Sequence, residues 1–287
     1  MVYSQFSTSI LIRRVLLWLS SRWAVLFGII ALALLAFYVA LNMLPTSPRI
    51  LTKGYDESII ITKGGIYSGN WESRNSEVPA VEVRTSQHVP IEHSNIRGAG
   101  ILIRSTAKNA DITIRYTTGY GITPTQWLNH EKPRRFLATE AFRNIVVENC
   151  YMEGTAGIYL GRHYKGNGST KQTIKIRYNK AKNIDGRVFK GKAIAQFVQF
   201  NFRNPVQHAE VAWNEIINEP DHSLVEDNIN IYNSRGTGAS PILIHNNYIQ
   251  GAYPLPATNK EYSGGGIFTG APAKDSTETT AHVRIFA

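Results

Sequence analysis

The chain has 287 residues, of which 43% are hydrophobic and 18% charged, so it is long enough for one large or two ordinary domains and is not a disordered polypeptide. Its single cysteine, Cys150, excludes an intramolecular disulfide framework and a multi-cysteine metal site. The formal net charge is +10, but the basic residues are scattered along the chain, which disfavours nucleic acid as a partner.

The first predicted element is a transmembrane helix at residues 23–44. This segment has no charged side chain, and as an α-helix it would be about 33 Å long, close to the thickness of the hydrocarbon core. Three arginines in residues 1–22 precede it, so the positive-inside rule places that N-terminal segment in the cytoplasm and the rest of the chain on the extracytoplasmic side. The alternative is a cleaved signal peptide, for which the sequence offers only weak cleavage sites.

A linker at residues 45–57 is predicted after the helix. Pro45 and Pro48 end the helix and stiffen the connection. From residue 58 onward the helical period is replaced by short runs of alternating Ile and Val between Gly, Asn and Pro, which is typical of strands separated by turns. The sequence therefore predicts an all-β body that begins at residue 58.

The body contains an internal repeat. Six ten-residue units align without gaps, with starts 23, 33, 29, 35 and 33 residues apart. The units are VPIEHSNIRG from Val89, ITIRYTTGYG from Ile112, IVVENCYMEG from Ile145, IKIRYNKAKN from Ile174, AEVAWNEIIN from Ala209 and ILIHNNYIQG from Ile242. Positions one and three are apolar in every unit, which puts them on one buried face of a strand. Position six is always a small or amide residue, which suits a tight turn and a stacked hydrogen-bonded ladder.

A second apolar stretch follows most units. These stretches are GILIRS at Gly100, GIYLGR at Gly157, FVQFNF at Phe197, NINIYN at Asn228 and GGGIFT at Gly264. A coil of two or three short strands with inward apolar columns, repeated in this way, is typical of a parallel β-solenoid.

Two segments carry a family resemblance. The NIVVENCYMEGTAGIYLGR and SPILIHNNYIQG stretches resemble the repeats of the right-handed parallel β-helix family, the pectin-lyase-like superfamily, and the resemblance covers residues 58–270. It implies an all-β, right-handed parallel β-helix. It does not imply one function, because the superfamily includes polysaccharide lyases, hydrolases, epimerases, phage adhesins and non-catalytic surface proteins.

Residues 271–287 form the C-terminal segment. Val283 and Ile285 alternate like the start of a further strand, and no amphipathic cap is evident. We therefore expect either a β-helix truncated at its C-terminus or a stack closed by another chain.

Position four of the repeat faces solvent and carries Glu148 and Arg177, two of the four candidate catalytic groups. It reads Glu92, Arg115, Glu148, Arg177, Ala212 and His245. One interpretation is a salt-bridge ladder that only fixes strand register. The resemblance implies another, a polysaccharide lyase site with Glu148, Lys175, Arg177 and Glu210 as catalytic residues and Ca²⁺ as the cofactor. The glutamates alternate with basic residues and no aspartate cluster is present, which departs from the calcium-dependent pectate lyase pattern.

A candidate metal site lies in the turn after the fifth unit. Its ligands would be Asp221, His222, Glu226 and Asp227, which offer oxygen and imidazole donors to a divalent cation. The alternative is an ordinary turn in which Pro220 and Asp221 reverse the chain and the other side chains face water.

The candidate substrate-binding residues come from two further segments. In the excursion at residues 121–142, Trp127 with Arg134 and Arg135 could stack on and pair with an acidic glycan, or could only pack over the solenoid wall. Arg162 and His163 are predicted to project from a loop. The function that follows is a membrane-anchored, extracytoplasmic β-helix that binds or processes an acidic polysaccharide. The alternative is a non-catalytic structural or adhesive surface solenoid.

Overall fold

The structure, a computed structural model, describes residues 54–124, 128, 130–261, 264–270 and 279–287. The predicted transmembrane helix, the N-terminal segment and Trp127 lie outside these residues. Within the described ranges no helix has the length and apolar character needed to cross a membrane.

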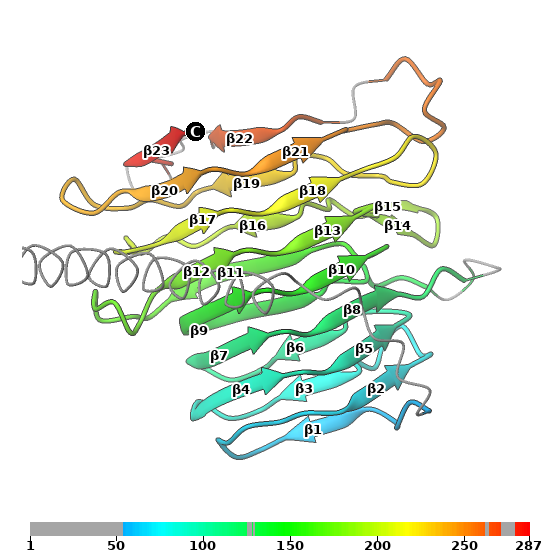
Figure 1. The fold of residues 1–287 in the computed structure, drawn as a ribbon, viewed down its shortest axis with the longest axis horizontal. Coiled ribbons are helices and arrows are strands. Elements are labelled where there is room, and N and C mark those ends of the chain that lie inside the picture. The colour runs from blue at the N-terminus through cyan, green and yellow to red at the C-terminus, as the bar shows by residue number, and fades with distance from the viewer. Residues whose placement is uncertain (1–53, 125–127, 129, 262–263, 271–278) are drawn as a thin grey trace, which may run out of the picture. The chain divides into compact units, whose positions relative to one another are not determined.

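The described residues are all-β and form a stack of coils (Figure 1). Two large sheets, of 14 and 7 strands, contain only parallel pairings, and each coil contributes strands to up to three stacks. The first stack comprises β1 (Ile59–Ile61), β3 (Val81–Val83), β6 (Ile103–Ser105), the start of β9 (Leu137–Glu148), β11 (Ile158–Tyr164), β16 (Val198–Phe200), β19 (Ile229–Tyr232) and β22 (Ile267–Gly270). The second stack comprises β4 (His88–Glu92), β7 (Ala110–Arg115), the end of β9, β12 (Ile174–Arg177), β17 (Glu210–Ala212), β20 (Ile242–His245) and β23 (Val283–Phe286).

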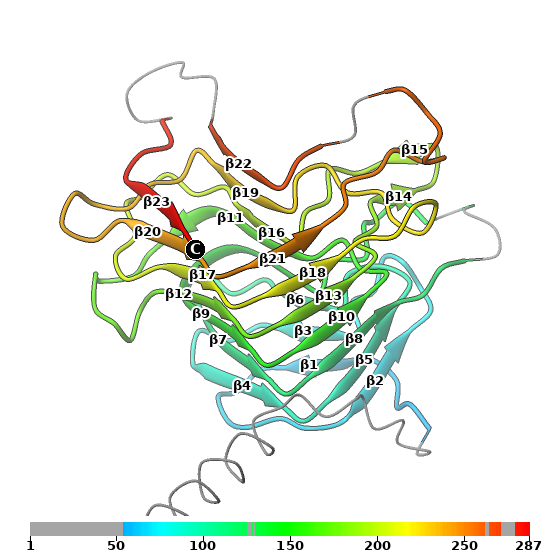
Figure 2. The ribbon, with the colours of Figure 1, turned by 45° about the horizontal axis from the view of Figure 1, so that its top comes forward.

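The 7-stranded sheet is the third stack, and Figure 2 shows it beside the second. It comprises β2 (Asn70–Ser73), β5 (Asn95–Gly98), β8 (Thr118–Gly121), β10 (Tyr151–Glu153), β13 (Lys180–Lys182), β18 (Glu215–Ile217) and β21 (Tyr248–Gln250). A small antiparallel pair, β14 (Arg187–Val188) and β15 (Gly191–Lys192), lies outside the stacks. This arrangement confirms the predicted parallel solenoid.

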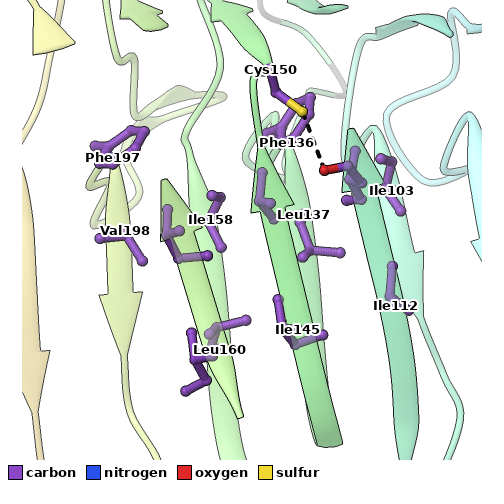
Figure 3. Close-up of a cluster of buried hydrophobic side chains, with 14 of the residues drawn as sticks. Ile103, Ile112, Phe136, Leu137, Ile145, Cys150, Ile158, Leu160, Phe197 and Val198 are labelled. Atoms are coloured by element: carbon purple, nitrogen blue, oxygen red, sulfur yellow. Dashed lines mark hydrogen bonds between the residues drawn. The ribbon is translucent and has the colours of Figure 1, made fainter. Parts of the chain in front are cut away.

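The strand register reproduces the columns of the sequence repeat. At position one, Ile112 pairs with Ile145 and Ile145 pairs with Ile174, and all three side chains are fully buried. Figure 3 shows Ile112 and Ile145 in the interior with Leu137, Ile158 and other apolar side chains. Burying a side chain of this size contributes about 1.5–3 kcal/mol, so the apolar columns are the main source of stability.

Position six forms the predicted hydrogen-bonded ladder. The backbone N–H of Asn179 donates to Asn214 Oδ1 at 3.1 Å, and the Asn179 side-chain amide donates to the same oxygen at 2.9 Å. Asn214 repeats both bonds with Asn247 Oδ1, at 3.1 and 2.9 Å. Asn214 Nδ2 also donates to the Ile176 carbonyl at 2.9 Å. The ladder therefore satisfies buried polar groups that the turn would otherwise leave without partners.

Position five lies at the turn between the second and third stacks. Its φ angle is positive in all six units, between 48° and 58°. The residues are His93, Tyr116, Asn149, Tyr178, Trp213 and Asn246. Large side chains rarely adopt this left-handed conformation, so the neighbouring ladder bonds must hold the turn in place.

Two boundaries refine the predictions from the sequence. The expected strand at Val283 and Ile285 is confirmed, because β23 pairs with β20. The excursion predicted at residues 121–142 is shorter than expected, since β8 ends at Gly121 and β9 begins at Leu137. The 12-residue β9 runs from the first stack into the second without a break and joins both into one sheet.

Candidate functional site

The four predicted catalytic side chains lie together on the second stack. Arg177 Nε donates to Glu148 Oε1 at 2.9 Å, and Arg177 Nη1 donates to Glu210 Oε2 at 3.2 Å. Lys175 Nζ donates to the same Glu210 oxygen, also at 3.2 Å. The alignment of the repeat therefore placed these groups on neighbouring strands correctly.

Two further residues extend this cluster. Arg115 Nε donates to Glu148 Oε2 at 3.1 Å, and His245 Nε2 lies 3.0 Å from Glu210 Oε1. We call the six side chains the charge array: Arg115, Glu148, Lys175, Arg177, Glu210 and His245. Its three permanent cations exceed its two carboxylates, which leaves a formal charge of +1 when His245 is neutral.

The pairing favours the charged forms of Glu210 and Arg177. Burial alone raises the pKa of Glu210, but the charge of Lys175 and the hydrogen bonds from His245 and Lys175 outweigh it, so the pKa is lowered. Burial alone lowers the pKa of Arg177, but the hydrogen bonds and charges of Glu148 and Glu210 raise it. Glu210 is therefore ionised and Arg177 protonated near neutral pH. Proton abstraction by Arg177 stays a prediction, and the ion pairs of Arg177 disfavour this role because a protonated guanidinium cannot accept a proton.

Exposed aromatic rings lie next to the array at position five. Tyr116, Tyr178 and Trp213 are 53%, 48% and 50% exposed. The Tyr178 and Trp213 rings are stacked, with centroids 6.4 Å apart and planes 15° from parallel, and His93 stacks on Tyr116 at 5.1 Å. We call His93, Tyr116, Tyr178 and Trp213 the aromatic turn row.

The aromatic turn row was not predicted from the sequence. The signal was present, because four of the six residues in the fifth column of the repeat carry these rings and the other two are asparagines. The row and the array are in contact: the Arg177 guanidinium carbon lies 6.0 Å from the Tyr178 ring centroid, and the Trp213 and His245 rings meet edge to face at 6.3 Å. Together they form one surface with stacked rings and cationic groups side by side.

Arg134 and Arg135 do not form the expected solvent-exposed basic patch, because both side chains are buried. Arg134 Nη2 donates to Asp185 Oδ2 at 2.7 Å. Arg135 Nη1 donates to the Ala156 carbonyl at 2.8 Å, and burial lowers the pKa of Arg135 to about 10. The arginines of this excursion therefore support the turns around them, while Trp127 lies outside the described residues.

Arg162 and His163 are exposed, as predicted, but they belong to strand β11 and not to a loop. The pairing of β11 with β9 is irregular between Leu160 and His163. The Arg162 backbone N–H faces Glu140 Oε2 at 3.4 Å. These residues lie on the first stack, so they do not share a strand stack with the charge array.

Three of the four predicted metal ligands have carboxylates that accept hydrogen bonds within the protein. Asp221 Oδ1 accepts a hydrogen bond from the Ala257 N–H at 2.7 Å, and Glu226 Oε2 accepts one from Gln196 Nε2 at 2.9 Å. Asp227 bonds Asn230 Nδ2 at 3.0 Å, and His222 lines a pocket with Asp221. Among the residues that the structure describes, no group of three or more His, Cys, Asp and Glu side chains is arranged to hold a metal ion.

Comparisons with models of protein families, with curated proteins and with solved structures found no significant match. The resemblance to the parallel β-helix family therefore rests on the repeat in the sequence and on the parallel stacks. The chemistry of the site is inferred from its own geometry.

Proposed function

We propose that the chain is a membrane-anchored, extracytoplasmic protein that binds an acidic polysaccharide without turning it over. The observation that carries this proposal is the stacked pair of exposed rings, Tyr178 and Trp213, beside the Arg177 guanidinium. The apolar face of a sugar ring suits an aromatic face, and a guanidinium pairs with a carboxylate in a bidentate way. A site that binds a polymer of acidic sugars would use the aromatic rings for the sugar faces and the guanidinium for the carboxylates.

The repeat of the fold suits a polymer. Parallel strands are spaced about 4.8 Å apart, so successive coils present similar groups at regular intervals along the solenoid. Arg115 and Arg177 retain 42% and 32% of their side-chain surface exposed, so both side chains are partly accessible from solution. A polysaccharide lying along the solenoid would contact aromatic rings and cationic groups at successive coils.

The charge state of Arg177 supports binding without turnover. Polyuronide elimination needs a base that accepts a proton and a positive group that stabilises the developing enolate charge. The array supplies the positive groups, but Arg177 is held protonated by two carboxylates. We therefore propose no catalytic step, and the proposed binding uses no Ca²⁺.

We also propose that the solenoid is right-handed and belongs to the parallel β-helix family. The parallel stacks and the asparagine ladder at the turn support this assignment. Parallel strand connections are right-handed in almost all proteins, which supports the handedness.

A structural or adhesive solenoid is the second candidate. It is favoured by the internal pairing of the array, because Glu148 and Glu210 each bind at least two cationic groups of the same protein. Under this alternative the charges only fix the strand register and no polysaccharide binds.

Titration of the full chain in detergent with polygalacturonate and with neutral dextran separates these functions. We expect saturable binding of polygalacturonate, little binding of dextran, weaker binding at high salt because the charges are screened, and no effect of a chelator. Absence of polygalacturonate binding to the folded chain would favour the structural solenoid. An ultraviolet absorbance increase from an unsaturated product would show a lyase and overturn binding without turnover.

A further inference from the structure

A polar pocket of 470 Å³ lies where the third-stack strands end. It is lined by residues that close or follow β8, β10, β13 and β18, and none of them belongs to the charge array or the aromatic turn row. Its volume falls within the range of about 300–1,000 Å³ that is usual for small-molecule sites.

An ion-pair group of Arg134, Asp185 and Arg187 lies at the pocket, and Asp185 and Arg187 belong to its lining. Asp185 is 1% exposed and accepts hydrogen bonds from Arg134 Nη2 at 2.7 Å and from Arg187 Nη2 at 2.5 Å. Arg134 Nη1 also donates to Thr123 Oγ1, at 3.1 Å. Because two guanidinium groups share one carboxylate, this ion-pair group has a formal charge of +1.

Two carboxylates, Glu153 and Asp221, line the pocket in addition. Glu153 Oε2 accepts a hydrogen bond from the Tyr151 hydroxyl at 2.7 Å, and Asp221 Oδ1 accepts one from the Ala257 N–H at 2.7 Å. An ionised carboxylate can accept about four hydrogen bonds, so both keep acceptor capacity. Together with the ion-pair group, these two carboxylates give a formal charge of −1 when His222 is neutral.

We infer that this pocket binds one amino-sugar unit with a free amino group. The ammonium would pair with Glu153 and Asp221, and the hydroxyls would bond to the remaining polar groups of the lining, such as Thr123 and Arg187. A uronate would meet these same carboxylates and be repelled. The pocket and the array have opposite formal charges, and the inference does not depend on the function proposed for the array.

Calorimetric titration of the full chain with glucosamine, glucose and glucuronate tests this inference, in a detergent without a sugar headgroup. We expect glucosamine to bind about tenfold more tightly than glucose, because a charge-assisted hydrogen bond distinguishes them. Glucuronate should not bind. Glu153→Gln should lower the glucosamine affinity about tenfold and leave the glucose affinity unchanged.

The matched control is Glu215→Gln. Glu215 is an acidic residue of β18 that pairs with Lys180 at 3.4 Å and does not line the pocket, so its variant should bind glucosamine like the parent. Should Glu153→Gln fail to fold by circular dichroism, Asp221→Asn tests the same charge. Equal affinity for glucosamine and glucose, no binding of glucosamine, or equal losses in the pocket variant and the control would overturn the inference. Glu153→Gln should still bind polygalacturonate like the parent. This titration therefore distinguishes a failure of the pocket inference from a failure of the polysaccharide binding proposed for the charge array.

Discussion

Positions four and six of the repeat lie two residues apart in every coil, yet they form very different columns. At position six, amide side chains are buried and bond to the next coil and to backbone carbonyls. At position four, and at the outward position two beside it, ionised side chains pair across the outer face, and the arginines remain partly exposed. The inner column satisfies groups that water cannot reach, whereas the outer column competes with water. Stability should therefore depend on the inner column, while the outer one is free to serve binding.

Breaking the inner column should have the largest effect on stability. Asn214→Ala leaves the backbone N–H and the side-chain amide of Asn179 without their shared acceptor, and each buried unsatisfied group costs about 1–3 kcal/mol. We expect the free energy of unfolding to fall by about 3 kcal/mol. Urea unfolding followed by circular dichroism would measure it, and a loss below about 1 kcal/mol would contradict the role of the ladder.

Breaking the outer column should lower the free energy of unfolding by a smaller amount. Arg177→Ala removes the cation that joins Glu148 to Glu210, but Arg115 still pairs with the first and Lys175 with the second. We expect a loss of about 1 kcal/mol in the free energy of unfolding, together with weaker polygalacturonate binding. The same urea titration measures the stability. A loss as large as that of Asn214→Ala would show that the two columns do not differ.

The smallest expected effect is a change in acid sensitivity. The folded-state pKa of Glu210 lies below its ordinary value of about 4.5, so its ion pairs stabilise the fold above about pH 4.5 and are lost as the pH falls through the folded-state pKa. Glu210→Gln should therefore be less stable than the parent by under about 1 kcal/mol at neutral pH. This difference should shrink in urea titrations below pH 4.5. A constant difference at all pH values would exclude Glu210 as its source.

The sequence predicted the columns well because each depends on side chains that repeat. The register that pairs Ile112 with Ile145 and Ile145 with Ile174 could be predicted from the sequence. Apolar residues alternate along each strand, so only one of its two faces can point into the core. Asn179 and Asn214 were predictable for the same reason, since small and amide residues recur at one position of the turn.

Burial in the irregular segments could not be predicted in the same way. Arg134 and its partner Asp185 are 51 residues apart in the chain, and nothing in the composition around either residue indicates that they meet. Arginine is seldom buried, so the sequence favoured an exposed basic patch. The exposure of the Tyr178 and Trp213 rings could not be predicted, because a bulky residue with positive φ is not expected at a repeated turn.

The most direct test of the proposed function compares two exposed aromatic residues. Trp213 belongs to the aromatic turn row, whereas Tyr248 is 57% exposed on β21 of the third stack. Polygalacturonate titration of the full chain should show about tenfold weaker binding for Trp213→Ala and parent-like binding for Tyr248→Ala. Parent-like binding by both variants, or equal losses in both, would contradict binding at the aromatic turn row.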